Sequence, residues 1–103
     1  MIIKMFKYIG DYGENKDIAR KIRLETILPC LEKKENITID FEKVTGATQS
    51  FIHALLADPI RKYPEIVFDK IIFKNCTDNI KVVVEIVEEY MQESISWSVD
   101  ADI

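Results

Sequence analysis

The fold of this chain is decided by residues 37–56, which read ITIDFEKVTGATQSFIHALL. The first six residues alternate apolar and polar side chains, so Ile37, Ile39 and Phe41 fall on one face of a strand. From Phe51 onward the apolar residues recur every three or four positions, which is the spacing of one face of a helix. The stretch therefore predicts a strand with one buried face, then a polar turn, then a helix.

Strand and helix patterns continue to alternate on both sides of this stretch. We expect strands over residues 2–9, 37–42, 66–74 and 95–101, and helices over residues 17–31, 51–63 and 80–91. In the last helix the apolar stripe is expected to hold Tyr90, whereas Glu88 is expected to face outward. Pro29 and Pro59 lack a backbone donor, so each of the first two helices is expected to kink or restart there.

These elements predict an α/β fold of the order β-α-β-α-β-α-β, a mostly parallel or mixed sheet of about four strands with three main helices. The last strand, 95–101, is expected at a sheet edge, where Trp97 is interpreted as a core or edge packing residue rather than a contact anchor. The polar side of residues 37–42 predicts that the back face of the sheet is incompletely covered.

Length and charge limit the classes of function. The chain has 103 residues, of which 48% are apolar and 31% charged, so residues 1–103 are expected to fold as a single domain. Eighteen acidic residues outnumber fourteen basic ones, giving a formal net charge of −4. Direct nucleic-acid binding is not expected, because no overall positive field exists to displace phosphate counterions.

Side chains for catalysis or metal binding are few. Cys30 and Cys76 are far apart and outside any Cys-x-x-Cys pattern, and His53 is the only histidine, so no metal or cofactor is expected. Asp40 and Asp69 are one conceivable carboxylate pair, which we interpret as two solvated strand positions. Without a nucleophile and base at recognisable spacing, the chain is predicted not to be an enzyme.

No apolar run approaches the roughly 20 residues that span a bilayer, and the first residues do not resemble a signal peptide. The expectations are therefore a cytoplasmic location without membrane contact, and a monomer or weak homodimer.

The turn over residues 45–51 is the most function-like feature, because partners and ligands of parallel α/β sheets meet the carboxyl ends of strands. Gly46 permits a left-handed backbone, and Thr48 or Ser50 can cap the helix that follows. The free amides of a helix N-terminus favour an anion, including a phosphate on Ser50 or Thr48, although capping alone is the simpler interpretation. Residues 75–77, at the next strand end, are a possible extension of this surface.

Residues 39–56, together with ARKIR at 19–23 and IIFKNC at 71–76, resemble the STAS-like domains of unknown function, the DUF4325 family. That family is similar to STAS domains such as anti-sigma-factor antagonists, whose turn carries Asp-Ser-Ser-Gly and is phosphorylated on the first serine. In that alignment Thr48, Gln49 and Ser50 take the first three places and Phe51 takes the place of glycine. Because glutamine cannot accept a phosphoryl group in this way, the resemblance implies the fold and a protein-binding end, without the phosphorylation switch.

The resemblance leads to a functional expectation. We expect a non-enzymatic regulatory module that docks a protein, either a histidine-kinase-like ATPase or a transcription regulator, through Gly46, Thr48, Gln49 and Ser50. The alternative is a domain that binds a small anion or a nucleotide at the same helix N-terminus.

Overall fold

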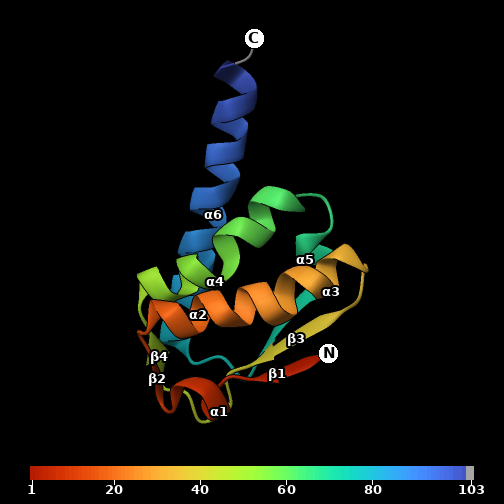
Figure 1. Cartoon of the computed structure of the whole chain (residues 1–103). Helices are drawn as coiled ribbons and strands as arrows, with labels where there is room; N and C mark the ends of the chain where they lie inside the picture. Colours follow the sequence, from red (N-terminus) through yellow and green to blue (C-terminus); the bar gives the residue numbers. More distant parts are fainter. Residues whose placement is uncertain (102–103) are drawn as a thin grey trace.

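The computed structural model describes the backbone of residues 1–101 and the side chains of residues 1–92. Its strands form two parallel sheets, which confirms the predicted α/β class (Figure 1). The larger sheet has the order β1 (Ile2–Lys4), β3 (Ile37–Asp40), β5 (Ile71–Lys74), and the smaller one pairs β2 (Tyr12–Gly13) with β4 (Gly46–Ala47).

The helices cover one face of the larger sheet. Ile3 of β1 lies level with Ile39 of β3, and both are buried in a single core cluster. The neighbouring residues Ile2 and Ile72 lie on the opposite face and are exposed. The prediction of an incompletely covered back face is therefore confirmed.

The predicted helix over residues 17–31 neither stops nor simply kinks at Pro29. It consists of α2 (Lys16–Ile22), a π-helical turn η1 (Arg23–Ile27) and α3 (Leu28–Glu32). Asn15 caps α2 by accepting hydrogen bonds from the amides of Asp17 and Ile18. In the π turn the Leu28 amide donates to the Arg23 carbonyl, five residues back, just before Pro29 interrupts the regular pattern.

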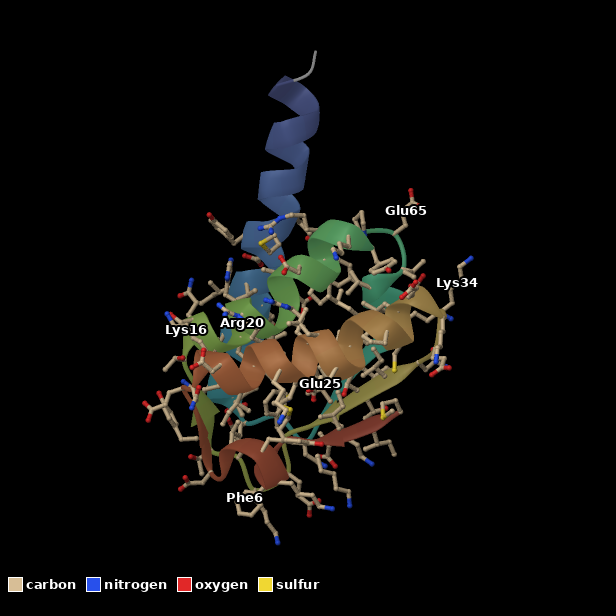
Figure 2. All side chains as sticks on the ribbon, viewed as in Figure 1. Phe6, Lys16, Arg20, Glu25, Lys34 and Glu65 are labelled. Atoms are coloured by element: carbon tan, nitrogen blue, oxygen red, sulfur yellow. The ribbon has the colours of Figure 1, made fainter. Side chains whose placement is uncertain are left out.

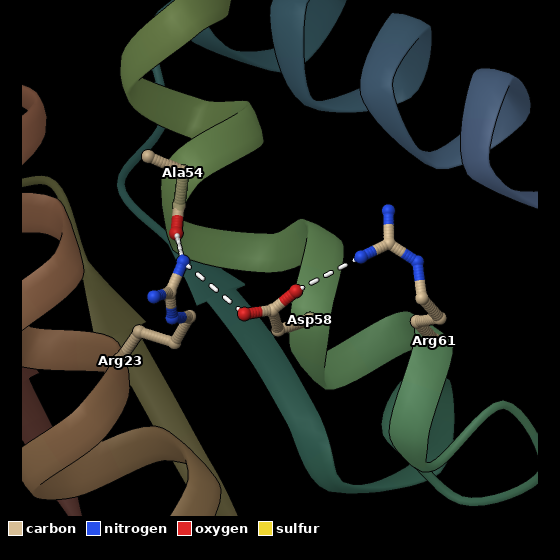
Figure 3. Close-up of polar contacts among 4 residues, drawn as sticks. All are labelled: Arg23, Ala54, Asp58 and Arg61. Carbon is tan, nitrogen blue, oxygen red and sulfur yellow. Dashed lines mark hydrogen bonds and ion pairs between the residues drawn. The ribbon is translucent and has the colours of Figure 1, made fainter.

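The second predicted helix is α4 (Gln49–Lys62), which continues through Pro59 without a restart. Close to this proline, Arg23 Nη1 donates to the Ala54 carbonyl oxygen at 3.0 Å and lies 3.5 Å from Asp58 Oδ2 (Figure 3). Asp58 also pairs with Arg61 at 3.0 Å. A side chain from η1 thus bonds to α4 at Ala54, next to Leu55, whose carbonyl loses its helical donor because Pro59 has no N–H.

The first strand is shorter than predicted, because the chain turns into α1 (Phe6–Ile9) soon after β1. The Met5 amide still donates to the Asp40 carbonyl, but β3 ends at Asp40 and offers no further backbone partner. Met5 is fully buried and Ile9 packs against the core, so a helical turn buries apolar side chains that an extended strand would carry past the sheet.

The prediction of a strand over residues 66–74 is half wrong. Residues 67–70 form the short helix α5 (Val67–Lys70), and only Ile71–Lys74 pair as β5. Since β3 has four residues and pairs with β5 from Ile37 onward, residues before Ile71 have no neighbouring strand there. The helical turn of α5 instead places the Val67 side chain in the core.

The predicted edge strand over 95–101 is wrong, because α6 (Asp78–Ala101) continues as a helix through that segment (Figure 1). No glycine or proline occurs between Asp78 and Ala101, so nothing local stops a helix once it has begun. The side chain of Trp97, predicted to pack at a sheet edge, lies outside the described residues. None of the described helices combines the length and the apolar character needed to cross a membrane.

Candidate functional site

The turn over residues 45–51 is more ordered than a loop, since it contains β4 and the first residues of α4. Gly46 and Ala47 pair in parallel with Tyr12 and Gly13 of β2. The Thr45 amide and hydroxyl both donate to the Asp11 carbonyl, at 2.7 and 2.9 Å. Hydrogen bonds to the β2 segment therefore hold the entry to α4 in place.

Gly46 does not have the left-handed backbone that we expected of it. Gly10 is the glycine with a positive φ among the described residues, whereas Gly46 is a strand residue. A Cβ at Gly46 would stand 2.9 Å from Asn79 Oδ1 and 3.1 Å from the Tyr12 ring. The position favours glycine because two side chains pack directly onto its backbone.

Thr48 is the helix cap, as predicted, and Ser50 is not. Thr48 Oγ1 accepts from the Phe51 amide at 3.1 Å. Gln49 and Ser50 are both exposed in the first turn of α4, and neither amide has a protein acceptor among the described residues. Of the two candidate phosphoacceptors, Thr48 has its hydroxyl in the hydrogen bond with the Phe51 amide, whereas Ser50 is exposed to solvent.

Of the possible extension over residues 75–77, Thr77 contacts the turn, and Asn79 beyond it does so as well. Thr77 Oγ1 donates to the Thr45 carbonyl at 3.0 Å and accepts from the Ile80 amide, so it caps α6 while bonding to the turn. Asn79 Oδ1 accepts from the Ala47 amide at 3.4 Å. We call the combined surface of residues 45–51 and 77–79 the rim.

Asp40, the last residue of β3, is buried, with 7% of its surface exposed. Asp40 Oδ1 accepts from Asn75 Nδ2 and from the Glu42 amide, each at 2.9 Å. These two donors, in that order, hold the pKa of Asp40 below its usual range. The ionised carboxylate joins the ends of β3 and β5.

The carboxylate pair of Asp40 with Asp69 does not form. The interpretation of both as solvated strand positions is half right, because Asp40 is in a strand but buried, whereas Asp69 is exposed but in a helix. Asp40 is a buried residue at the carboxyl end of β3. Asp69 lies in α5, just before the opposite end of the sheet.

The side chains beside the first turns of α4 are polar and aromatic. His53 projects toward Tyr90 of α6, with ring centroids 6.2 Å apart. Lys16, Gln49, Ser50, His53 and Ala54 line a shallow depression, and Figure 2 shows Lys16 extending outward from the start of α2.

One face of α6 continues this surface with apolar side chains that sequence analysis did not select. Val82, Ile86 and Tyr90 are 53%, 42% and 57% exposed. Their four-residue spacing places them on one side of the helix. This stripe begins near Asn79, which bonds to the turn, and ends at Tyr90, which contacts His53 of α4. We had expected Tyr90 in the buried stripe of this helix. The sequence did contain a sign of a second apolar face, because residues 82–87 hold more apolar side chains than one buried stripe requires.

The cysteines show no sign of reactivity. Burial raises the pKa of both the Cys30 and the Cys76 thiol, and the thiolate is the nucleophilic form. Within the part of the chain whose side chains are described, no three His, Cys, Asp or Glu residues gather as a metal site would require.

The fold and the rim define a parallel α/β domain in which a capped turn carries the chain from a strand end into a helix. The family model described as a STAS-like domain of unknown function (DUF4325) matches residues 18–81, and the chain belongs to that family. This span includes β3, the turn, α4 and β5. Comparisons with curated proteins and with solved structures gave no match.

Proposed function

We propose that this protein is a non-enzymatic regulatory module that binds another protein through a docking face made of Gln49, Ser50, His53, Val82, Ile86 and Tyr90. The observation that carries the proposal is the exposed apolar stripe of α6 directly beside the exposed first turn of α4.

The composition of the docking face supports this role. Protein interfaces combine an apolar centre, often with tyrosine, and a polar border that forms hydrogen bonds. Ile86 and Tyr90 supply the centre, while Gln49 and Ser50 supply polar groups at one side. The bonds from Thr77 and Asn79 to the turn hold the two helices together, so the face is organised before a partner arrives.

The proposed partner class rests on a resemblance. The chain belongs to a STAS-like family, and because this family resembles anti-sigma-factor antagonists, we propose a histidine-kinase-like ATPase or a transcription regulator as the partner. Gln49 occupies the position of the phosphorylated serine, so binding is expected without a phosphorylation switch at that residue.

The proposal is tested by measuring the affinity for an ATPase or regulator encoded beside this protein, using calorimetry with purified proteins. Tyr90→Ala and Ile86→Asp are expected to weaken binding by about tenfold or more, as central interface residues do. Gln49→Glu and Ser50→Glu are expected to weaken binding while leaving stability equal or slightly higher, because acids in the first turn interact favourably with the helix dipole.

Gln92→Glu is the matched control for Gln49→Glu, since it makes the same chemical change at another exposed helical position. It is expected to bind like the unmodified protein. Equal affinities for Tyr90→Ala, Ile86→Asp and Gln92→Glu would show that the docking face is not the binding surface.

Anion or nucleotide binding is the second candidate function. It is favoured by Lys16 beside the exposed amides of Gln49 and Ser50. Inorganic phosphate or ATP at about a hundred times its dissociation constant would add about 2.7 kcal/mol to the free energy of unfolding. A rise in melting temperature that Lys16→Gln reduces would support this function, and no rise with either anion would contradict it.

A further inference from the structure

A second binding site lies on the other side of α6 from the docking face. Residues two apart on an α-helix point about 200° away from each other, so Glu88 points away from both Ile86 and Tyr90. Glu88 faces a groove of about 200 Å³ between α6, α4, α5 and β5. The rest of its lining is apolar: Leu56, Ile60, Val67, Phe68, Ile71 and Phe73.

The groove has an apolar floor and aromatic walls. Leu56, Ile60 and Val67 are buried core residues, whereas Phe68 and Phe73 are partly exposed. A space of this size is comparable to cavities that hold benzene in protein interiors. It therefore fits a ligand body of one ring or a short alkyl chain.

Glu88 gives the groove its chemical selectivity. Sequence analysis placed this residue on the outward face of the helix, but it is half-buried at the groove. No cation pairs with it among the side chains that the structure describes. Burial first, and repulsion from Glu85 second, raise the pKa of Glu88.

A cation beside the Glu88 carboxylate would offset both the cost of burying it and its repulsion from Glu85. Aromatic rings such as those of Phe68 and Phe73 also attract ammonium groups. We propose that this groove binds a small amphipathic amine, with the apolar body on Leu56, Ile60 and Val67 and the ammonium group at Glu88. The site is separate from the docking face and does not depend on the proposed function.

The proposal is tested with three probes of one shape and different charge: phenethylamine, 2-phenylethanol and 3-phenylpropionate. Binding is followed by the NMR shifts of the Leu56, Ile60, Val67 and Ile71 methyl groups in the full-length protein at neutral pH. We expect phenethylamine to bind with a dissociation constant of about 1 mM and about three- to tenfold more tightly than the alcohol. The carboxylate is expected to bind most weakly, because it would face Glu88.

Three variants separate the effect of charge from the effect of shape. Glu88→Gln is expected to bind the amine and the alcohol about equally, while Glu89→Gln, the same change at the exposed neighbouring residue, keeps the preference for the amine. Phe68→Ala is expected to weaken all three probes. The proposal is overturned if these methyl signals do not move with phenethylamine, or if Glu88→Gln retains the preference for the amine.

Discussion

Replacement of Phe51 by alanine is expected to lower the free energy of unfolding by about 3–5 kcal/mol, the range for a large buried aromatic side chain. Phe51 has no exposed surface although it lies in the first turn of α4, next to exposed Ser50. Its ring packs against β2 so closely that a Cβ placed on Gly13 would stand 3.1 Å from it. The side chain therefore joins the start of α4 to the smaller sheet.

The loss is measured by urea unfolding followed by circular dichroism. Ser50→Ala is the matched control and is expected to change stability by less than about 0.5 kcal/mol, as surface substitutions usually do. Phe51→Leu, which keeps much of the volume, is expected to fall between the two. A loss for Phe51→Ala no larger than that of Ser50→Ala would show that the ring is not part of the core.

Phe51 bears on the resemblance to the Asp-Ser-Ser-Gly turn. In the alignment that the resemblance implies, Phe51 takes the place of glycine, and Phe51 belongs to the core. Replacing Phe51 by glycine is expected to remove the ring and to add the cost of a flexible residue in a helix, about 1 kcal/mol relative to alanine. Burial of Phe51 therefore stabilises this turn.

Replacement of Arg23 by methionine is expected to lower the free energy of unfolding by about 1.5–3 kcal/mol, the range for hydrogen bonds that involve a charged group. Methionine keeps an apolar side chain of similar length and removes the donor to the Ala54 carbonyl (Figure 3). The ion pair with Asp58 contributes less, because its 3.5 Å separation is longer and Asp58 is partly exposed.

A double-mutant cycle with Asp58→Asn separates the two contributions. We expect a coupling energy below about 1 kcal/mol, so most of the loss would remain when Asp58 is already changed. Arg61→Met is the matched control: it makes the same substitution at an exposed arginine that also pairs with Asp58, and a change below about 0.5 kcal/mol is expected. An equal loss for Arg23→Met and Arg61→Met would contradict a special role for the bond to Ala54.

Sequence patterns predicted the three main helices and the cap of α4 because these signals are local. The apolar spacing that predicted α2 to α3, α4 and the first part of α6 requires only that each helix buries one side. The capping role of Thr48 likewise depends on atoms three residues away. The family resemblance was confirmed over residues 18–81, which include the whole turn.

The strand wrongly predicted over 95–101 had a local signal against it, the absence of glycine and proline from Asp78 to Ala101. Other errors occurred where distant residues decide the outcome. Val67 is in a helix because β3 is too short to pair with it, and Gly46 is required by Tyr12 and Asn79, which come from two other parts of the chain. Glu88 was expected outside and is half-buried, whereas Tyr90 was expected inside and is exposed. The periodic pattern of α6 allows several apolar stripes, and packing against α4 selects one of them.

The sequence by itself determined that the chain alternates strands and helices, that helices follow residues 15–17 and 48–51, and that a polar turn with a capping hydroxyl precedes α4. Those properties arise from side-chain periodicity and from hydrogen bonds between near neighbours. Only the tertiary structure decided how long each strand is, which side of α6 is exposed and that Glu88 lies over an apolar groove. Strand pairing and burial are interactions between segments far apart in the chain, and no local pattern specifies which segments will meet.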